Sequence, residues 1–159
     1  MKVYVGRQPI FNIYEQIVGY ELLYRNKQEN RFPNVDSDHA TVNVIVNSFL
    51  SIGIDKVSQG KPAFVNFSGN LLMSSVFDYI DPTKVIVEIL EDVKLTTEIV
   101  TRIKELNQRG FKMALDDFVL TDNLEDHEEI FNYIDYIKMD FLVTPLLQRM
   151  EIENVIRTK

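Results

Sequence analysis

Polar side chains that could bind a metal ion close the main apolar runs of this sequence. Most of them are carboxylates and one is an amide, a set of oxygen donors that hard divalent cations such as Mg²⁺, Mn²⁺ or Ca²⁺ prefer. Carboxylates held close together raise one another's pKa unless a cation lies between them. The pattern therefore predicts a divalent-metal site, built from Glu21, Asn66 in "AFVN", Glu88 in "VIVE", Asp116 and Asp117 in "MALDD", and Asp140 in "YIKMD". Lys138 lies at the same strand end as Asp140.

Taken one at a time, these residues also have ordinary structural interpretations. Asp116 and Asp117 could form a turn or cap a helix, and Asn66 could form an Asx-turn. Lys138 and Asp140 could form an ion pair on the surface. A shared site is favoured because each of these residues lies late in a predicted strand.

The elements that must position these residues alternate between strands and helices. Such alternation is typical of an α/β protein with a parallel sheet, and in a TIM-type (βα) barrel the working residues lie at the carboxyl ends of the strands. We therefore expect the strand-end residues to share one rim. The predicted strands are 3–11 and 16–25, which form a hairpin, then 62–68, 84–90, 111–118 and 136–140; the predicted helices are 38–53, 68–77, 96–110, 125–132 and 145–156.

The composition narrows the classes of function. The chain has 159 residues, 45% hydrophobic and 26% charged, which fits one globular domain. It has no apolar run of about 18 residues or more and no secretory signal, so we expect a cytoplasmic protein without a membrane contact. The absence of cysteine excludes disulfides and thiolate sites, and two histidines exclude a multi-histidine site. The formal charge of −7 argues against a nucleic-acid polymer as partner.

Five motifs in order resemble the EAL domains of cyclic-di-GMP signalling, over essentially the whole chain. The "E-A-L-x-R" signature resembles "ELLYR", and the opening "GRQPIF" with "VGYELLYR" resembles the divergent EAL domains that precede an HDOD domain. The other motifs that match are Asn66 in "FVNFS", Glu88 in "VEILE", Asp116-Asp117-Phe118, and Lys138-Met139-Asp140.

This resemblance implies an activity and a role for each residue. Active EAL domains hydrolyse cyclic-di-GMP to linear pGpG with Mg²⁺ or Mn²⁺, by two-metal catalysis. It further implies that Arg25 meets a ligand phosphate and that Lys138 orients the attacking water. The implied ligands of one metal are Glu21, Asn66, Glu88 and Asp116, with Asp117 taking part in the second metal and in catalysis and Asp140 as a further member of the shell.

Two departures from the family pattern favour a catalytically impaired module. Residues 119–123 read "VLTDN" where active relatives have a glycine-containing loop, and the sequence predicts five barrel strands where a complete barrel has eight. We thus expect residues 1–159 to be an EAL-like domain truncated at its C-terminal end, without the last three βα units or an HDOD domain. Its exposed sheet edges would pair with a protein partner or a second copy.

The expected function is therefore that of a regulatory or interaction module of the cyclic-di-GMP pathway with a residual metal site. Two alternatives stay open because the metal ligands are retained. One is a metal-dependent cyclic-di-GMP phosphodiesterase, active when the barrel is complete. The other is a cyclic-di-GMP receptor that binds without hydrolysis.

Overall fold

In the part of the chain that the structure describes, six strands form one sheet, and neighbours in sequence are neighbours in space. The structure is a computed structural model and describes residues 4–25, 42, 45, 53–116, 129–140 and 144–157. The first two strands are antiparallel, and every later pair is parallel. The strands are β1 (Tyr4–Phe11), β2 (Ile17–Arg25), β3 (Ala63–Phe67), β4 (Val85–Ile89), β5 (Lys112–Leu115) and β6 (Tyr136–Ile137).

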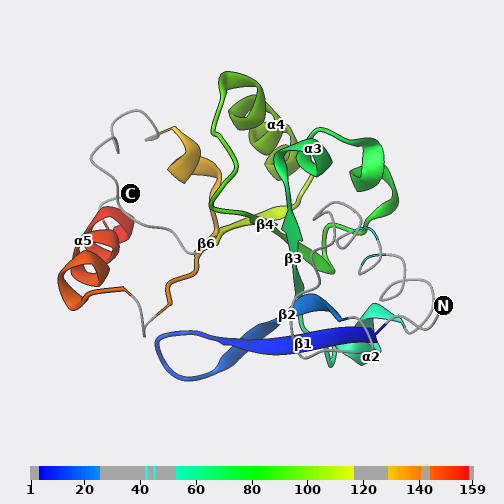
Figure 1. Cartoon of the computed structure of the whole chain (residues 1–159), viewed down its shortest axis with the longest axis horizontal. Coiled ribbons are helices and arrows are strands. Elements are labelled where there is room, and N and C mark those ends of the chain that lie inside the picture. The colour runs from blue at the N-terminus through cyan, green and yellow to red at the C-terminus, as the bar shows by residue number, and fades with distance from the viewer. Residues whose placement is uncertain are drawn as a thin grey trace.

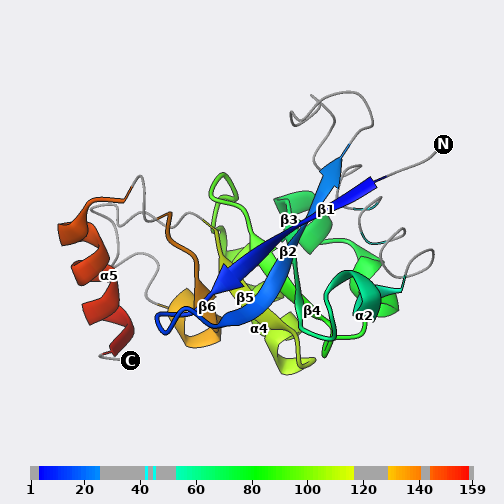
Figure 2. The ribbon, with the colours of Figure 1, turned by 90° about the horizontal axis from the view of Figure 1, so that it is seen from below.

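The sheet curls as half of a barrel, with the hairpin of β1 and β2 at one end and β6 at the other (Figure 1). Seen from below, the hairpin crosses in front of the parallel strands (Figure 2). This architecture confirms the predicted α/β fold, an incomplete TIM-type barrel with an N-terminal hairpin. Within the described residues, five strands, β2 to β6, are of the barrel type.

The helices lie between the strands and after β6. α4 confirms the predicted helix 96–110: the Thr96 side chain accepts a hydrogen bond from the Ile99 N–H, and Gly110 follows the helix with φ +94°. No described helix is both long enough and apolar enough to cross a membrane. The helices are α2 (Ile54–Val57), α3 (Gly69–Leu72), α4 (Thr97–Gln108), α5 (Leu146–Arg157) and the 3₁₀ helices η2 (Ser75–Tyr79) and η4 (Ile130–Tyr133).

Some elements differ from the sequence prediction. The predicted helix 68–77 consists of two short helices, because Ser74 has an extended backbone and its side chain caps η2. The predicted strand 136–140 is only two residues long. The predicted helix 38–53 falls mostly outside the described residues, of which 42 and 45 are helical. Of the predicted helix 125–132, residues 125–128 fall outside the described residues, and η4 occupies the remainder.

The strands present alternate side chains to two faces, as the pleat of a sheet requires. One face packs with the helices in the main core, which includes Val65, Val87, Met113 and, from α4, Ile103 and Leu106. The other face, which we call the inner face, carries a smaller cluster of Phe64, Ile86 and Ala114, with Ile10 and Tyr136 packed against it.

Gly19 lets β2 approach the aromatic ring of Phe64 on the inner face. A Cβ atom at position 19 would lie 2.6 Å from Phe64 Cε2 and 2.7 Å from the Pro62 carbonyl oxygen, distances that real Cβ atoms do not show. Phe64 in turn meets Tyr136 edge to face, with 5.4 Å between the ring centroids. The inner face is therefore closely packed between residues of β2, β3 and β6.

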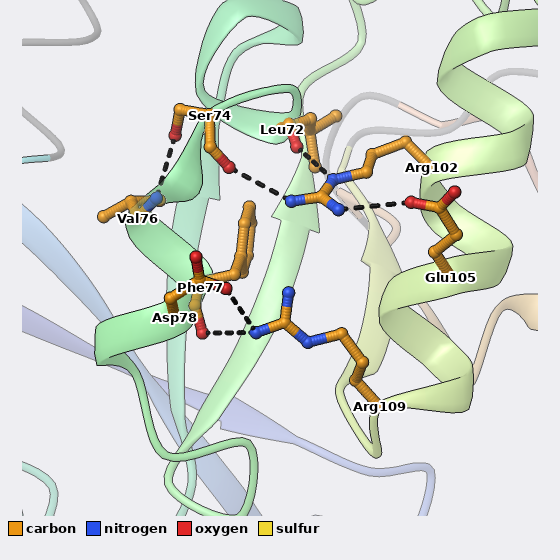
Figure 3. Close-up of polar contacts among 8 residues, drawn as sticks. All are labelled: Leu72, Ser74, Val76, Phe77, Asp78, Arg102, Glu105 and Arg109. Atoms are coloured by element: carbon orange, nitrogen blue, oxygen red, sulfur yellow. Dashed lines mark hydrogen bonds and ion pairs between the residues drawn. The ribbon is translucent and has the colours of Figure 1, made fainter.

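Two arginines of the α4 region hold the segment of α3 and η2 in place (Figure 3). Arg102 donates through Nε to the Leu72 carbonyl at 2.9 Å and through a terminal nitrogen to the Ser74 carbonyl at 3.1 Å. Arg109 donates to the Phe77 carbonyl at 3.0 Å. These bonds tie α4 and the residue after it to the backbone of α3 and η2.

Candidate functional site

Five polar side chains gather on the inner face at the carboxyl ends of the strands. Each comes two residues after a residue of that face, and the two-residue period of a strand keeps both on the same side. Asn66 follows Phe64 in this way, and Glu88 follows Ile86. We call the five residues the strand-end cluster: Glu21, Asn66, Glu88, Asp116 and Lys138.

The ammonium group of Lys138 stands among three carboxylates of the strand-end cluster. Its Nζ donates to Glu21 Oε2 at 3.0 Å and to Asp116 Oδ1 at 2.9 Å, and it forms an ion pair with Glu88 Oε1. The Lys138 side chain is 19% exposed. Because an ammonium has three N–H donors, three carboxylates saturate it. The described ion pairs of Lys138 are thus with the acidic residues of the strand-end cluster.

Asn66 connects the cluster across β2, β3 and β4. Its Nδ2 donates to Glu21 Oε1 at 3.1 Å, and its Cα is the register partner of Glu88. The two oxygens of Glu21 thus accept from different residues, Asn66 and Lys138. The contacts therefore run without a break from the second strand to the residue that follows β6.

Glu88 is the most deeply buried carboxylate of the cluster, with no exposed surface. Its Oε2 accepts no hydrogen bond from the residues that the structure describes. Burial raises the pKa of Glu88 to about 8; the Lys138 ammonium opposes this rise, and the nearby charges of Glu21 and Asp116 add to it. A buried carboxylate oxygen without a partner costs free energy. A proton or a further cation at this oxygen would therefore remove that free-energy cost.

Lys138 keeps its positive charge in this setting. Burial by itself would lower its pKa, but the negative charges of Glu88 and Glu21 outweigh that effect and hold the pKa above its ordinary value. The strand-end cluster thus combines one permanent cation with three acidic groups. The acidic groups outnumber the cation, so the site favours additional positive charge.

The donor chemistry of the cluster fits a divalent cation. Three carboxylates and an amide supply the oxygen ligands that Mg²⁺, Mn²⁺ and Ca²⁺ prefer, and Glu88 Oε2 is an unsatisfied acceptor among the described residues. However, no three His, Cys, Asp or Glu side chains in the described ranges are placed to bind one metal ion. The Lys138 ammonium instead takes the central place among the carboxylates.

A cavity of about 510 Å³ borders the cluster on the side of the hairpin. Glu21 and Lys138 supply polar groups to its wall. The apolar lining comes from β1, β3 and β6 and includes Ile10, Phe11, Phe64 and Tyr136. A mostly apolar wall with a few convergent polar groups is the usual character of a small-molecule site.

The structure brings together five of the predicted site residues and leaves three without a described place in the site. Asp117 lies outside the described residues, as does the segment 119–123. Arg25 is the last residue of β2, but its side chain is not among those described. Asp140 follows β6 and is exposed, whereas Glu88 is buried. The proposed roles of Asp117, Arg25 and Asp140 therefore stay predictions.

Sequence reasoning missed the residues that support the cluster from below. Phe64 and Tyr136 form an aromatic floor on the inner face, and Gly19 makes room for the Phe64 ring. One signal could have found them: each stands two positions before a predicted ligand or catalytic residue. The central position of Lys138 among the carboxylates had no signal in the sequence.

Comparison of sequences finds bacterial relatives, and no protein-family model matches the chain. The uncharacterized protein YuxH of Bacillus subtilis is 44% identical over 154 residues, which are 96% of this chain and 38% of YuxH. The protein CdgJ of Vibrio cholerae, named a cyclic di-GMP phosphodiesterase, is 36% identical over 144 residues, which are 90% of this chain and 33% of CdgJ. The chain thus spans less than two fifths of either relative.

Comparison of structures finds the same half-barrel in solved proteins. The Bacillus subtilis YkuI protein has an EAL domain and was solved in complex with c-di-GMP and calcium. It matches with a TM-score of 0.69 and 19% identity, over 98% of this chain and 46% of YkuI. An EAL domain protein of Listeria monocytogenes matches with a TM-score of 0.64 and 20% identity, over 98% of this chain and 72% of that protein.

The fold and the site together define a (βα)-barrel protein with an acidic cluster at the carboxyl ends of its strands. The chain is homologous to part of YuxH and of CdgJ, and its fold matches part of the barrel of the solved EAL proteins.

Proposed function

We propose that this chain is an EAL-type module of the cyclic-di-GMP pathway that binds a divalent cation and the dinucleotide in a regulatory role, with impaired hydrolysis. One observation carries this proposal: Glu21, Glu88 and Asp116, from three strand ends, converge on the Lys138 ammonium, and Asn66 from a fourth donates to Glu21. Under this proposal, residues 1–159 form one EAL-like domain. The names of the relatives support the choice of ligand, since CdgJ is named for cyclic di-GMP and YkuI was solved with it.

The residues that would hold the cation are Glu21, Asn66, Glu88 and Asp116, with Asp117 as a ligand of a second cation. A bound Mg²⁺ or Mn²⁺ supplies Lewis-acid activation of water and stabilises charge on phosphoryl oxygens. Lys138 would orient the water, and Arg25 would bind a phosphate of the dinucleotide. The cavity beside Glu21 and Lys138 gives a small molecule access to the cluster.

An impaired hydrolytic step is supported by two features of this chain. The segment 119–123 reads "VLTDN", without the glycines of the loop in active relatives that the chain resembles. In addition, the Lys138 ammonium forms ion pairs with three of the acidic groups that would otherwise be metal ligands.

Calorimetry tests the proposed binding function directly. Cyclic-di-GMP is titrated into the protein in buffer with Ca²⁺, which permits binding without turnover, and again with a chelator in place of Ca²⁺. We expect binding that needs Ca²⁺ and that is lost in Glu88→Gln. The matched control is Glu91→Gln, because Glu91 is an exposed residue just after β4. No heat of binding in any of the wild-type titrations would exclude the ligand-binding proposal.

A second candidate function is hydrolysis of cyclic-di-GMP to pGpG. The observation that favours it is that the described structure assembles every predicted ligand of the first cation together with Lys138. Incubation with cyclic-di-GMP and Mn²⁺, followed by chromatography for pGpG, separates this candidate from a receptor that binds without cleaving. Production of pGpG that Glu88→Gln abolishes would establish the enzyme.

A protein partner or a second copy would bind at the sheet edges. β1 and β6 are the outer strands of the described sheet, and an outer strand presents backbone groups that another strand can pair with. Size-exclusion chromatography with light scattering measures the mass directly. A monomer at every concentration tested would exclude the homodimer.

A further inference from the structure

The three acidic groups around Lys138 resemble a cation-binding site in which the cation is the protein's own ammonium group. Lys138 Nζ lies 3.0 Å from Glu21 Oε2 and 2.9 Å from Asp116 Oδ1 and pairs with Glu88 Oε1. These three acidic groups belong to different strand ends and share no other described cation. The ammonium therefore neutralises the charge that a divalent cation would otherwise neutralise.

Lys138 and a divalent cation cannot both bind these three acidic groups without weakening each other's binding. Like charges a few ångströms apart repel strongly inside a protein, where the dielectric constant is lower than in water. Each of the three carboxylates also spends an oxygen on Lys138. A metal ion that takes these oxygens must therefore break the ion pairs of Lys138.

The surroundings of Lys138 allow its side chain to move. The residue lies just past the end of β6, a strand only two residues long, and its backbone N–H is held by the Leu115 carbonyl at 2.9 Å. The backbone is thus fixed, while the four-carbon stem of a lysine is flexible. The cavity of about 510 Å³ that Lys138 lines lies directly beside it. The ammonium can therefore leave the carboxylates for the cavity without a change in the fold.

We propose that Lys138 is an internal competitor of the divalent cation: it occupies the strand-end cluster in the metal-free protein and must withdraw before the metal binds. This inference rests on the proposed function, since it assumes that the cluster binds a metal. It adds a regulatory consequence, because the affinity for the metal is then set by the strength of three internal ion pairs. A ligand that attracts the Lys138 ammonium into the cavity would strengthen metal binding.

Metal affinity in Lys138→Met tests the competition. Methionine keeps an unbranched side chain of similar length and removes the charge. By calorimetry with Ca²⁺ alone, we expect Lys138→Met to bind at least about tenfold more tightly than the wild type. The matched control is Lys104→Met, which makes the same change of charge on α4, away from the cluster. We expect Lys104→Met to leave the affinity unchanged.

The outcomes separate this inference from the proposed function. Equal or weaker Ca²⁺ binding by Lys138→Met, with clear binding by the wild type, would overturn the competition and leave the proposed function standing. No Ca²⁺ binding by either protein would overturn both. Tighter binding by Lys138→Met alone supports the competition.

A second measurement uses the unaltered protein and does not depend on the folding of a variant. The protein is treated with an amine-modifying reagent with and without Ca²⁺, and modification is measured by mass spectrometry. We expect Lys138 to be protected without Ca²⁺ and to become several-fold more reactive with it, because withdrawal frees its ammonium. The reactivity of Lys104 should not change. Constant protection of Lys138 at saturating Ca²⁺, with binding confirmed by calorimetry, would refute the withdrawal.

Discussion

Asn66 and Glu88 are direct register partners on β3 and β4, and both belong to the strand-end cluster. Their environments differ, because the Asn66 amide donates to Glu21 while Glu88 Oε2 accepts no hydrogen bond from the described residues. The sheet thus places a buried carboxylate with an unpaired oxygen beside a neutral residue. Glu88 is for this reason the residue whose substitution is the most informative.

The first prediction concerns Glu88 and pH. Its pKa rises from 4.5 to about 8 on folding, chiefly through burial, so the folded protein binds this proton more tightly than the unfolded chain. The contribution of Glu88 to the free energy of unfolding is therefore fully present below pH 4.5 and is lost as the pH rises to about 8. In chelator, Glu88→Gln should remove this loss.

The measurement is urea denaturation of the wild type and of Glu88→Gln across this range of pH. We expect the stability of the wild type relative to the variant to decrease as the pH rises. Glu91→Gln, an exchange at an exposed position, controls for the general effect of removing a carboxylate. A constant difference between wild type and Glu88→Gln at every pH would contradict the prediction.

The second prediction concerns metal removal and Asn66. A ligand that binds only the folded state stabilises it, by about 2.7 kcal/mol when its concentration is a hundred times its Kd. Ca²⁺ should therefore raise the melting temperature, and a chelator should reverse the rise. Asn66→Leu keeps the size of the side chain but removes its oxygen and its hydrogen bond to Glu21, so we expect most of the rise to be lost. Asn132→Leu, at an exposed position in η4, should retain it.

The third prediction concerns the close contact of β2 with Phe64. Gly19→Ala places a Cβ atom 2.6 Å from Phe64 Cε2, so the ring or the strand must shift. We expect a loss of about 1–3 kcal/mol in the free energy of unfolding, as is usual for overpacking. Gly69→Ala is the control, because its nearest neighbours would be 3.9 Å away. Equal losses in the free energy of unfolding for the two exchanges would show that the contact of position 19 with Phe64 does not restrict the side chain there.

The fourth prediction concerns the arginines that hold α3 and η2. Arg102→Lys removes the forked donor that bonds the Leu72 and Ser74 carbonyls, so at least one carbonyl loses its partner. We expect a loss of about 1–3 kcal/mol in the free energy of unfolding. Arg109→Lys is the comparison, since that side chain is 38% exposed against 17% for Arg102 and bonds one carbonyl. A larger loss for Arg109→Lys would contradict this assignment.

Much of the fold could be predicted because its signals are local. The strand of "KVIVEIL" and the helix between Thr96 and Gly110 follow from apolar patterns and end signals inside the segments themselves. The break at Ser74 could not be predicted, because an apolar pattern continues across it while the serine caps a new helix. α2 is only four residues long and is too short to show helical periodicity.

Five of the predicted residues share one rim of the described structure, but the contacts among them could not be predicted. The ends of the predicted strands indicated which residues share a rim. The described structure brings Glu21, Asn66, Glu88 and Asp116 together there with Lys138. The direction of the Lys138 side chain depends on carboxylates contributed by three other strand ends. No local pattern encodes such a contact, so the ion pairs of Lys138 could not be predicted from the sequence.

Glu21 and Lys138 are 117 positions apart, yet their side chains touch. By contrast, the hairpin that contains Glu21 pairs residues within 4–25. Contacts between residues far apart in sequence form late, because the loss of chain entropy precedes the gain from the contact. The order of events in folding should thus begin at the hairpin and finish at the site, so that the ability to bind a ligand appears only when β6 has docked.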